Sequence, residues 1–205
     1  MQLTGQSWIG AHADPDLGVM LVSLDESPEA RLEMERQIPH EMMHLVLYQQ
    51  LGDTYKRLPI WLNEGLASVA ELYPNPDYLI LLDEAHKKDK LIPLINLCDT
   101  FPREASDTFL AYAEAASFTQ FLFQHQGSEG VQSLIRQYSS GENCQQGIQS
   151  AFGGNLEQFE FQWRQETFGE VSPITALENF SPWLMLLTLA IIFPIILAIS
   201  ISAKG

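Results

Sequence analysis

The chain contains little cysteine and few basic residues. Among its 205 residues there are two cysteines and no CxxC pair, which excludes a disulfide-rich scaffold and gives no sign of a zinc ribbon or a thiol redox motif. Lys and Arg together number 11 against 26 Asp and Glu, so the formal net charge is −15. Because affinity for nucleic acid comes from neutralising phosphates with Lys and Arg, we expect no nucleic-acid partner.

Long charged runs, repeats and low-complexity segments are also missing. Charged residues make up 18% of the chain, while hydrophobic residues make up 46%. This composition excludes a wholly disordered chain and is sufficient for one core.

The C-terminal part lacks charge altogether from Asn179 to Ala203. The apolar run Trp183–Ile201 has the length of a helix that crosses a bilayer, with Trp183 at the expected interface. We therefore predict a domain at 1–170, a linker at 171–181 and one transmembrane helix at 182–203. A buried core helix is the alternative, although such helices rarely run this long without a polar face.

The orientation of this predicted single-pass membrane protein stays open. Lys204 is the only charge after the span, and it favours a cytoplasmic C-terminus with an extracytoplasmic domain. Met1–Leu24 has no basic start followed by an apolar run, so no signal peptide is recognisable. A tail-anchored protein with a cytoplasmic domain is the alternative.

The soluble part is predicted to begin with strands and to continue with helices. Trp8–His12 and Gly18–Leu24 are strand-length apolar runs, separated by a turn sequence at 14–18. Ser27-Pro28-Glu29 is typical of a helix start, and the helical spacing continues to Leu51, before Gly52. Pro39 lies inside this stretch, so we expect a bend or two abutting helices.

Further helices are predicted near 60–72, 78–88, 107–125, 129–138, 143–151 and 155–168. Two strands followed by a helical majority indicate an α+β domain.

His40-Glu41-Met42-Met43-His44 is an HExxH motif. Residues four apart on a helix share one face, so both imidazoles can reach one Zn²⁺ ion. Glu41 can then stand beside the metal and take a proton from the attacking water. The alternative is an ordinary helix with one surface histidine and one core histidine.

Glu64 is the candidate third ligand, because catalytic zinc of the His₂Glu type needs one more protein oxygen. It lies 20 residues after His44, in the segment Trp61–Ser68, which leaves room for a second, antiparallel helix. Apolar residues surround Glu64 in sequence, so this helix is expected to be buried. A buried, unpaired carboxylate is costly, and a cation partner explains its presence.

HExxH followed by WLNEGLAS (Trp61–Ser68) resembles the gluzincin zinc metallopeptidases. WLNEGLASVAE is similar to the corresponding stretch of zinc aminopeptidases, and Trp8–Phe168 resembles the peptidase MA-like domain, a compact relative often attached to membranes. The resemblance implies a zincin (thermolysin-like) catalytic domain and Zn²⁺ as cofactor. It makes His40, His44 and Glu64 the zinc ligands, with Glu41 as general base and acid.

The resemblance also implies two supporting residues. Ser68 falls where such enzymes place a group that fixes a metal ligand. Tyr112 falls where a tyrosine donates a hydrogen bond to the oxyanion. For Tyr112, a core residue with its hydroxyl at the surface is the alternative.

Two features depart from the aminopeptidase pattern. The loop that carries the amine-binding glutamate in those enzymes is matched only by Gly10-Ala11-His12-Ala13-Asp14, which has no glutamate. Their large N-terminal sheet domain is also missing. The Gly18–Leu24 strand is predicted as the edge to which an extended peptide adds.

The remaining candidates carry less information. His12, His86 and His125 are single histidines without ligand-like spacing, and we interpret them as surface or core residues. Cys98 and Cys144 either form one disulfide in an exported domain or stay reduced in the cytosol, and we favour the bridge.

The leading hypothesis is a membrane-anchored metallopeptidase that hydrolyses peptide bonds of a peptide or protein substrate with a zinc-bound water activated by Glu41. A catalytically silent zinc-binding module of the same fold is the alternative. The two differ in whether chelation and Glu41→Gln abolish peptide cleavage.

Overall fold

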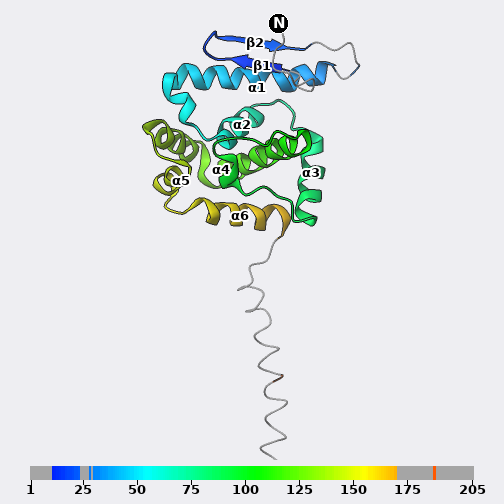
Figure 1. Ribbon diagram of the computed structural model, residues 1–205, viewed down its shortest axis with the longest axis vertical. Coiled ribbons are helices and arrows are strands. Elements are labelled where there is room, and N and C mark those ends of the chain that lie inside the picture. Colours follow the sequence, from blue (N-terminus) through cyan, green and yellow to red (C-terminus); the bar gives the residue numbers. More distant parts are fainter. Residues whose placement is uncertain (1–10, 24–27, 29, 170–186, 188–205) are drawn as a thin grey trace, which may run out of the picture. The chain divides into compact units, whose positions relative to one another are not determined.

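The structure is a computed structural model, and it describes residues 11–23, 28, 30–169 and 187 (Figure 1). Its elements are β1 (Ala11–Asp14), β2 (Val19–Val22), α1 (Ala30–Leu51), the 3₁₀ helix η1 (Gly52–Arg57), α2 (Ile60–Val69), α3 (Pro76–Lys87), the 3₁₀ helix η2 (Leu94–Leu97), α4 (Ala105–Ser140), α5 (Cys144–Phe152) and α6 (Leu156–Phe168). A small sheet followed by a helical majority confirms the α+β class.

The chain divides into two compact units, Met1–Trp163 and Arg164–Gly205. Across the described residues, no helix is both long enough and apolar enough to cross a membrane. The predicted span at 182–203 lies outside the described residues apart from Leu187, as does the linker at 171–181. The span and the domain boundaries therefore stay predictions.

The N-terminal hairpin contains the turn that was predicted from the sequence. β1 and β2 pair antiparallel, with Ala11 opposite Val22. The Asp14 carboxylate accepts a hydrogen bond from the Leu17 N–H at 3.0 Å, and Gly18 takes a positive φ of 66°. Asp and Gly are the residues that supply these two features of a tight turn, so the turn signal at 14–18 identified the hairpin correctly.

α1 is one continuous helix of 22 residues, with Pro39 inside it. Of the two alternatives predicted for Pro39, two abutting helices are excluded, and a bend within one helix stays a prediction. Proline removes one backbone N–H and the hydrogen bond that it would make. The helix continues through this position because the hairpin packs on one side of it and α2 on the other (Figure 1).

Helix α2 lies between α1 and α4, in the middle of the domain. Its Trp61 begins a row of buried aromatic rings that continues with Phe118 of α4 and Trp163 of α6. Adjacent ring centroids are 5.1 and 5.9 Å apart, in edge-on contacts. This arrangement fixes the start of α2, the helix that carries Glu64, in the core.

α4 covers the two helices predicted at 107–125 and 129–138. Gly127, between them, has φ 65° and ψ 178°, which is not helical, so the helix is kinked at this residue. Glycine adopts such angles without a steric penalty. The two predicted helices are thus the two arms of α4.

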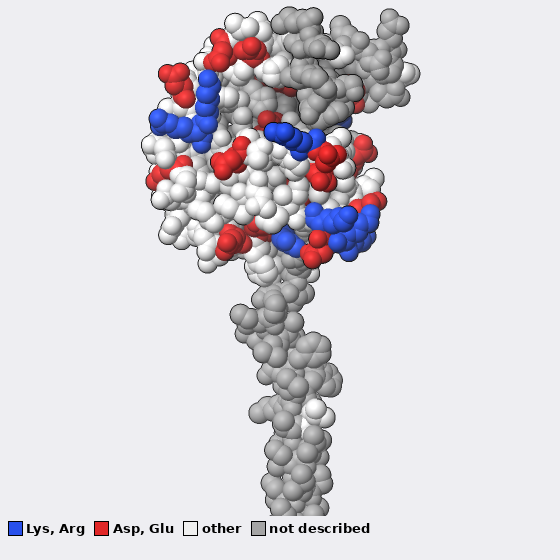
Figure 2. Space-filling model, in the orientation of Figure 1, with Lys and Arg blue, Asp and Glu red and all other residues white. Residues whose placement is uncertain are grey.

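Charged side chains on the face shown in Figure 2 form mixed groups in which acidic and basic atoms adjoin. Pairs such as Lys87 with Asp83 and Lys88 with Glu84 join residues one turn apart at the C-terminal end of α3. Exposed pairs of this kind contribute little to stability, because water and salt screen them. The stability of the domain therefore depends on the apolar core and on its crosslink.

That crosslink is a disulfide between Cys98 and Cys144, the alternative favoured from the sequence. It joins the end of η2 to the start of α5, and it lies against the start of α2. The Cys98 carbonyl accepts the Ile60 N–H at 2.8 Å, and the Trp61 indole N–H points at the Cys144 sulfur at 3.3 Å. The bridge thus fixes the segments that support α2.

We predict that loss of this bridge destabilises the domain substantially. The crosslink closes a chain separation of 46 residues, which corresponds to about 4 kcal/mol in the chain-entropy model. The double variant Cys98→Ser, Cys144→Ser should lose about 3–4 kcal/mol in free energy of unfolding, measured by denaturant titration. An unchanged free energy of unfolding in this variant would contradict the prediction.

We also predict that Gly65→Ala weakens the contact between α2 and α4. A Cβ atom at Gly65 would lie 2.0 Å from Thr119 Oγ1 and 2.5 Å from the Ala115 carbonyl oxygen. Overpacking of this kind costs about 1–3 kcal/mol, and a lower melting temperature should report it. Adding Thr119→Ala should recover only part of the loss, because the Ala115 carbonyl remains; full stability of the single variant would disprove the close contact.

Candidate metal centre

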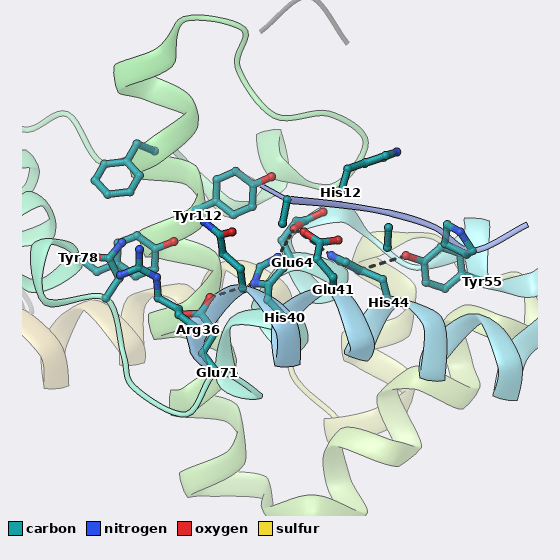
Figure 3. A pocket seen from close by; sticks show the side chains of 16 residues that line it. His12, Arg36, His40, Glu41, His44, Tyr55, Glu64, Glu71, Tyr78 and Tyr112 are labelled. Carbon is teal, nitrogen blue, oxygen red and sulfur yellow. Dashed lines mark hydrogen bonds and ion pairs between the residues drawn. The ribbon is translucent and has the colours of Figure 1, made fainter. Parts of the chain in front are cut away.

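His40, His44 and Glu64 come together at the contact between α1 and α2 (Figure 3). The two histidines lie one turn apart on α1, and both point the Nε2 atom at the same carboxylate oxygen. His40 Nε2 lies 3.4 Å and His44 Nε2 3.6 Å from Glu64 Oε2. One ligand atom from each residue lies within 4.8 Å of the other two.

These separations fit a divalent metal ion. Two ligand atoms at about 2.05 Å from a tetrahedral zinc ion are about 3.3 Å apart. The side chains are also shielded, with exposed fractions of 14%, 10% and 18% for His40, His44 and Glu64. Two imidazoles and one carboxylate, shielded and converging, form a donor set that can hold such an ion, and the predicted trio is brought together.

The chain between the two helices explains how Glu64 reaches the histidines. α1 ends at Leu51, and Gly52 turns the backbone with φ 54° into η1. Pro59 then precedes α2. Gly65, directly after Glu64, allows α2 to approach the α4 backbone so closely that no side chain fits between them.

Glu71 orients the ring of His40. Its Oε1 lies 2.9 Å from His40 Nδ1, and its side chain is only 6% exposed. With Nδ1–H as the donor, Nε2 of the neutral ring keeps its lone pair for a metal. Glu71 therefore selects the tautomer that a ligand needs.

Asn63 and Tyr55 orient the ring of His44 in the same way. His44 Nδ1 lies 3.2 Å from both Asn63 Oδ1 and the Tyr55 hydroxyl oxygen. Asn63 Nδ2 donates a hydrogen bond of 2.8 Å to that hydroxyl. This network, from α2 and η1, directs the second Nε2 at Glu64.

The electrostatics of the three side chains are those of a cluster that attracts cations. Burial lowers the pKa of His40, but hydrogen bonds and charge from Glu64 and Glu71 outweigh it and raise that pKa to about 9. Burial raises the pKa of Glu64, but the two histidines lower it to about 2. In the absence of a metal, protons on the imidazoles therefore balance the carboxylates.

Glu41 and Tyr112 line the same cavity as the three candidate ligands. Glu41 follows His40 on α1 and is buried at 8% exposure, and Figure 3 shows its carboxylate beside that of Glu64. The Tyr112 ring lies 6.3 Å from the His40 ring, between centroids. Burial raises the pKa of Tyr112, with the Glu64 charge adding to the shift, so its hydroxyl stays a hydrogen-bond donor.

Ser68 is placed differently from these residues. It is buried on α2, and its hydroxyl interacts with Tyr78, whose pKa is raised by burial and lowered by this contact. The contacts that fix the histidine rings come from Glu71, Asn63 and Tyr55 instead. Among the described residues, no hydrogen bond thus joins Ser68 to a candidate metal ligand.

The cavity at this centre has a volume of about 480 Å³, and β1 borders it. Three consecutive residues of this strand, Ala11, His12 and Ala13, line it. Successive side chains point to opposite faces of a strand. Lining by three consecutive residues therefore indicates that an edge of the strand, and not one of its faces, borders the cavity. The edge predicted at Gly18–Leu24 belongs to β2, which pairs with β1 and adds no residue to the described cavity lining, so the peptide-binding edge stays a prediction.

Sequence reasoning missed several residues of the cavity. Asn63 and Glu71 lie within the quoted WLNEGLASVAE stretch, so their closeness to Glu64 was an available signal. No signal in the sequence pointed to Tyr55, because only the path of η1 brings it to His44. His12, interpreted as a surface or core residue, is exposed yet lines the cavity.

A helix with two converging histidines, beside a helix that adds a carboxylate, defines the class of metallopeptidase-like domains. The family model of the Peptidase MA superfamily matches residues 2–169. The chain belongs to this superfamily, as its resemblance indicated. No curated protein and no solved structure shows significant similarity to the chain.

We predict that metal binding at pH 7 releases protons. With a pKa of about 9, His40 carries a proton at pH 7, and this proton must leave before Nε2 can bind a metal. Apparent affinity for Zn²⁺ should therefore rise with pH up to about 9. Calorimetry in buffers of different ionisation enthalpy measures the release, which should be smaller in Glu71→Gln; release of no proton by the wild type at pH 7 would refute the raised pKa.

Proposed function

We propose that the protein is a zinc-dependent metallopeptidase with a zincin (thermolysin-like) catalytic domain, in which His40, His44 and Glu64 hold the ion. One observation carries the proposal: ligand atoms of His40, His44 and Glu64 lie within 4.8 Å of one another, in the cavity that the buried Glu41 also lines. Membership of the Peptidase MA superfamily supports the reaction type.

Zinc held by these residues supplies Lewis-acid chemistry, because it polarises a carbonyl group and makes water easier to deprotonate. Glu41 is suited to take the proton from the attacking water and to transfer it to the leaving amine. A position inside the cavity, on the helix that carries both histidines, keeps its carboxylate close to the reacting atoms. The reaction is hydrolysis of a peptide bond.

Tyr112 is suited to stabilise the oxyanion. Its phenol lines the cavity and holds its proton at neutral pH, as a hydrogen-bond donor must. A donor aimed at charge that develops in the transition state contributes mainly to kcat.

The edge of β1 is suited to bind the substrate backbone. Within the described residues the sheet has two strands, and the edge of β1 opposite β2 borders the cavity. An extended peptide adds to such an edge through main-chain hydrogen bonds. Peptides and proteins are therefore the proposed substrate class.

We further propose, from the sequence, that the apolar run Trp183–Ile201 anchors the domain in a membrane. The Cys98–Cys144 bridge supports the extracytoplasmic orientation, because disulfides persist in oxidising compartments. A tail-anchored protein with a cytoplasmic domain is the alternative arrangement.

The test is cleavage of a library of internally quenched peptides by the full chain, with and without a chelator. Removal of the metal should abolish cleavage, and added Zn²⁺ should restore it. Glu41→Gln should keep the metal but lower kcat by about 100-fold or more, because it loses the proton acceptor.

Glu35→Gln is the matched control, since Glu35 lies on the same helix and pairs with Arg31 outside the cavity lining. This variant should cleave like the wild type. If the protein binds zinc but cleavage is insensitive both to the chelator and to Glu41→Gln, the protein is a catalytically silent zinc-binding module.

A further inference from the structure

The charges that line the cavity are distributed unevenly. Glu41, Glu64 and Glu71 gather around the histidines. Arg36 is the single Lys or Arg among the described residues that line the cavity. It lies on α1, one turn before His40, so a positive charge stands at one end of an otherwise acidic centre (Figure 3).

The guanidinium of Arg36 has hydrogen-bonding capacity to spare. Its Nη2 donates to Glu33 Oε2 at 2.5 Å, and this is its only hydrogen-bond partner among the described residues. Arginine carries five N–H donors in a planar fork that matches a carboxylate. Glu33 is 44% exposed, so its side chain can turn to water when another carboxylate takes its place.

Neutral polar residues accompany Arg36 in the cavity lining, and the Glu71 charge also reaches this end, because burial and then Glu71 raise the pKa of Tyr78 while Arg36 lowers it. The neutral residues are Gln37, Asn75 and Tyr78. Gln37 Oε1 is buried and has no hydrogen-bond partner among the described residues. A buried acceptor without a donor is costly. The Gln37 side chain lines the cavity and its Nε2 donates to Glu33 Oε2 at 3.4 Å, so its amide is free to turn toward an entering peptide N–H when Glu33 moves away. Gln37 and Arg36 together match a backbone N–H followed by a carboxylate.

From this arrangement we infer that the Arg36 end of the cavity is a specificity subsite for a carboxylate on the substrate. The inference rests on the proposed peptidase function and adds a substrate preference to it. The chain as a whole carries a net charge of −15, which repels acidic substrates at long range. Selection therefore comes from one local ion pair, between Arg36 and a single acidic group of the substrate close to the cleaved bond.

Two sources supply such a carboxylate: an Asp or Glu side chain within the peptide, or the C-terminus of the peptide. The experiment uses quenched peptides that carry Glu or Gln at each position in turn, with the C-terminus either free or amidated. At one position the wild type should prefer Glu over Gln by about tenfold in kcat/KM, a typical contribution of one charge-assisted hydrogen bond. A preference for free over amidated peptides instead assigns the subsite to the C-terminus.

Arg36→Gln should reduce this preference to about one, and Arg36→Lys should retain part of it. Arg31→Gln is the matched control, because Arg31 forms a similar ion pair with Glu35 on the same helix but does not line the cavity. This control should keep the full preference. If Arg36→Gln lowers kcat/KM equally for acidic and neutral peptides, the inference is overturned and Arg36 is a structural residue.

A binding measurement separates this inference from the proposed function. Fluorescence anisotropy of the same labelled peptides on the zinc-loaded Glu41→Gln variant reports affinity without cleavage. A preference for the carboxylate that is lost on adding Arg36→Gln supports the subsite even if the wild type cleaves nothing, in which case only the peptidase proposal fails. Equal affinity for acidic and neutral peptides rejects the subsite, whatever the activity.

Discussion

The largely shielded carboxylate of Glu64, 18% exposed, is the constraint on which the rest of this structure depends. An ionised carboxylate loses its hydration when it enters a protein interior, and it persists there only beside a cation or strong donors. Here it faces two imidazole Nε2 atoms, at 3.4 and 3.6 Å. This oxygen needs a positive partner, and together with the two imidazoles it forms a donor set for a metal cation. A bound metal would therefore offset the electrostatic cost of shielding Glu64 from water.

Holding that carboxylate in place requires rigid support on the far side of α2. The helix packs so closely on α4 that Gly65 leaves no space for a Cβ atom. At its start, the Ile60 N–H is bonded to Cys98, whose disulfide ties η2 to α5. Pre-organised ligands bind a metal more tightly than ligands that must be ordered first. The tight contact and the crosslink therefore belong to the site as much as to the fold.

The sequence predicted what depends on local spacing. The hairpin turn, the helices and the pairing of His40 with His44 all follow from short-range patterns, and the predicted trio with Glu64 is brought together. Local patterns were weaker where tertiary packing decides. Pro39 lies inside one continuous α1, which is packed on both sides, so the alternative of two abutting helices is excluded, and β1, not β2, adds residues to the described cavity lining.

Sequence patterns did not predict the contacts between segments that are distant in the sequence. Tyr55 reaches His44 only through the path of η1, and the hydrogen bond from His40 to Glu71 spans 31 residues. These partners hold each ring by Nδ1, which leaves Nε2 for the metal. Arg36 lies one turn before His40, so the helix that supplies the two ligands also supplies the positive charge at the end of the cavity. Under the proposed function and subsite, one helix thereby sets both the position of a bound metal and the direction in which an acidic substrate lies.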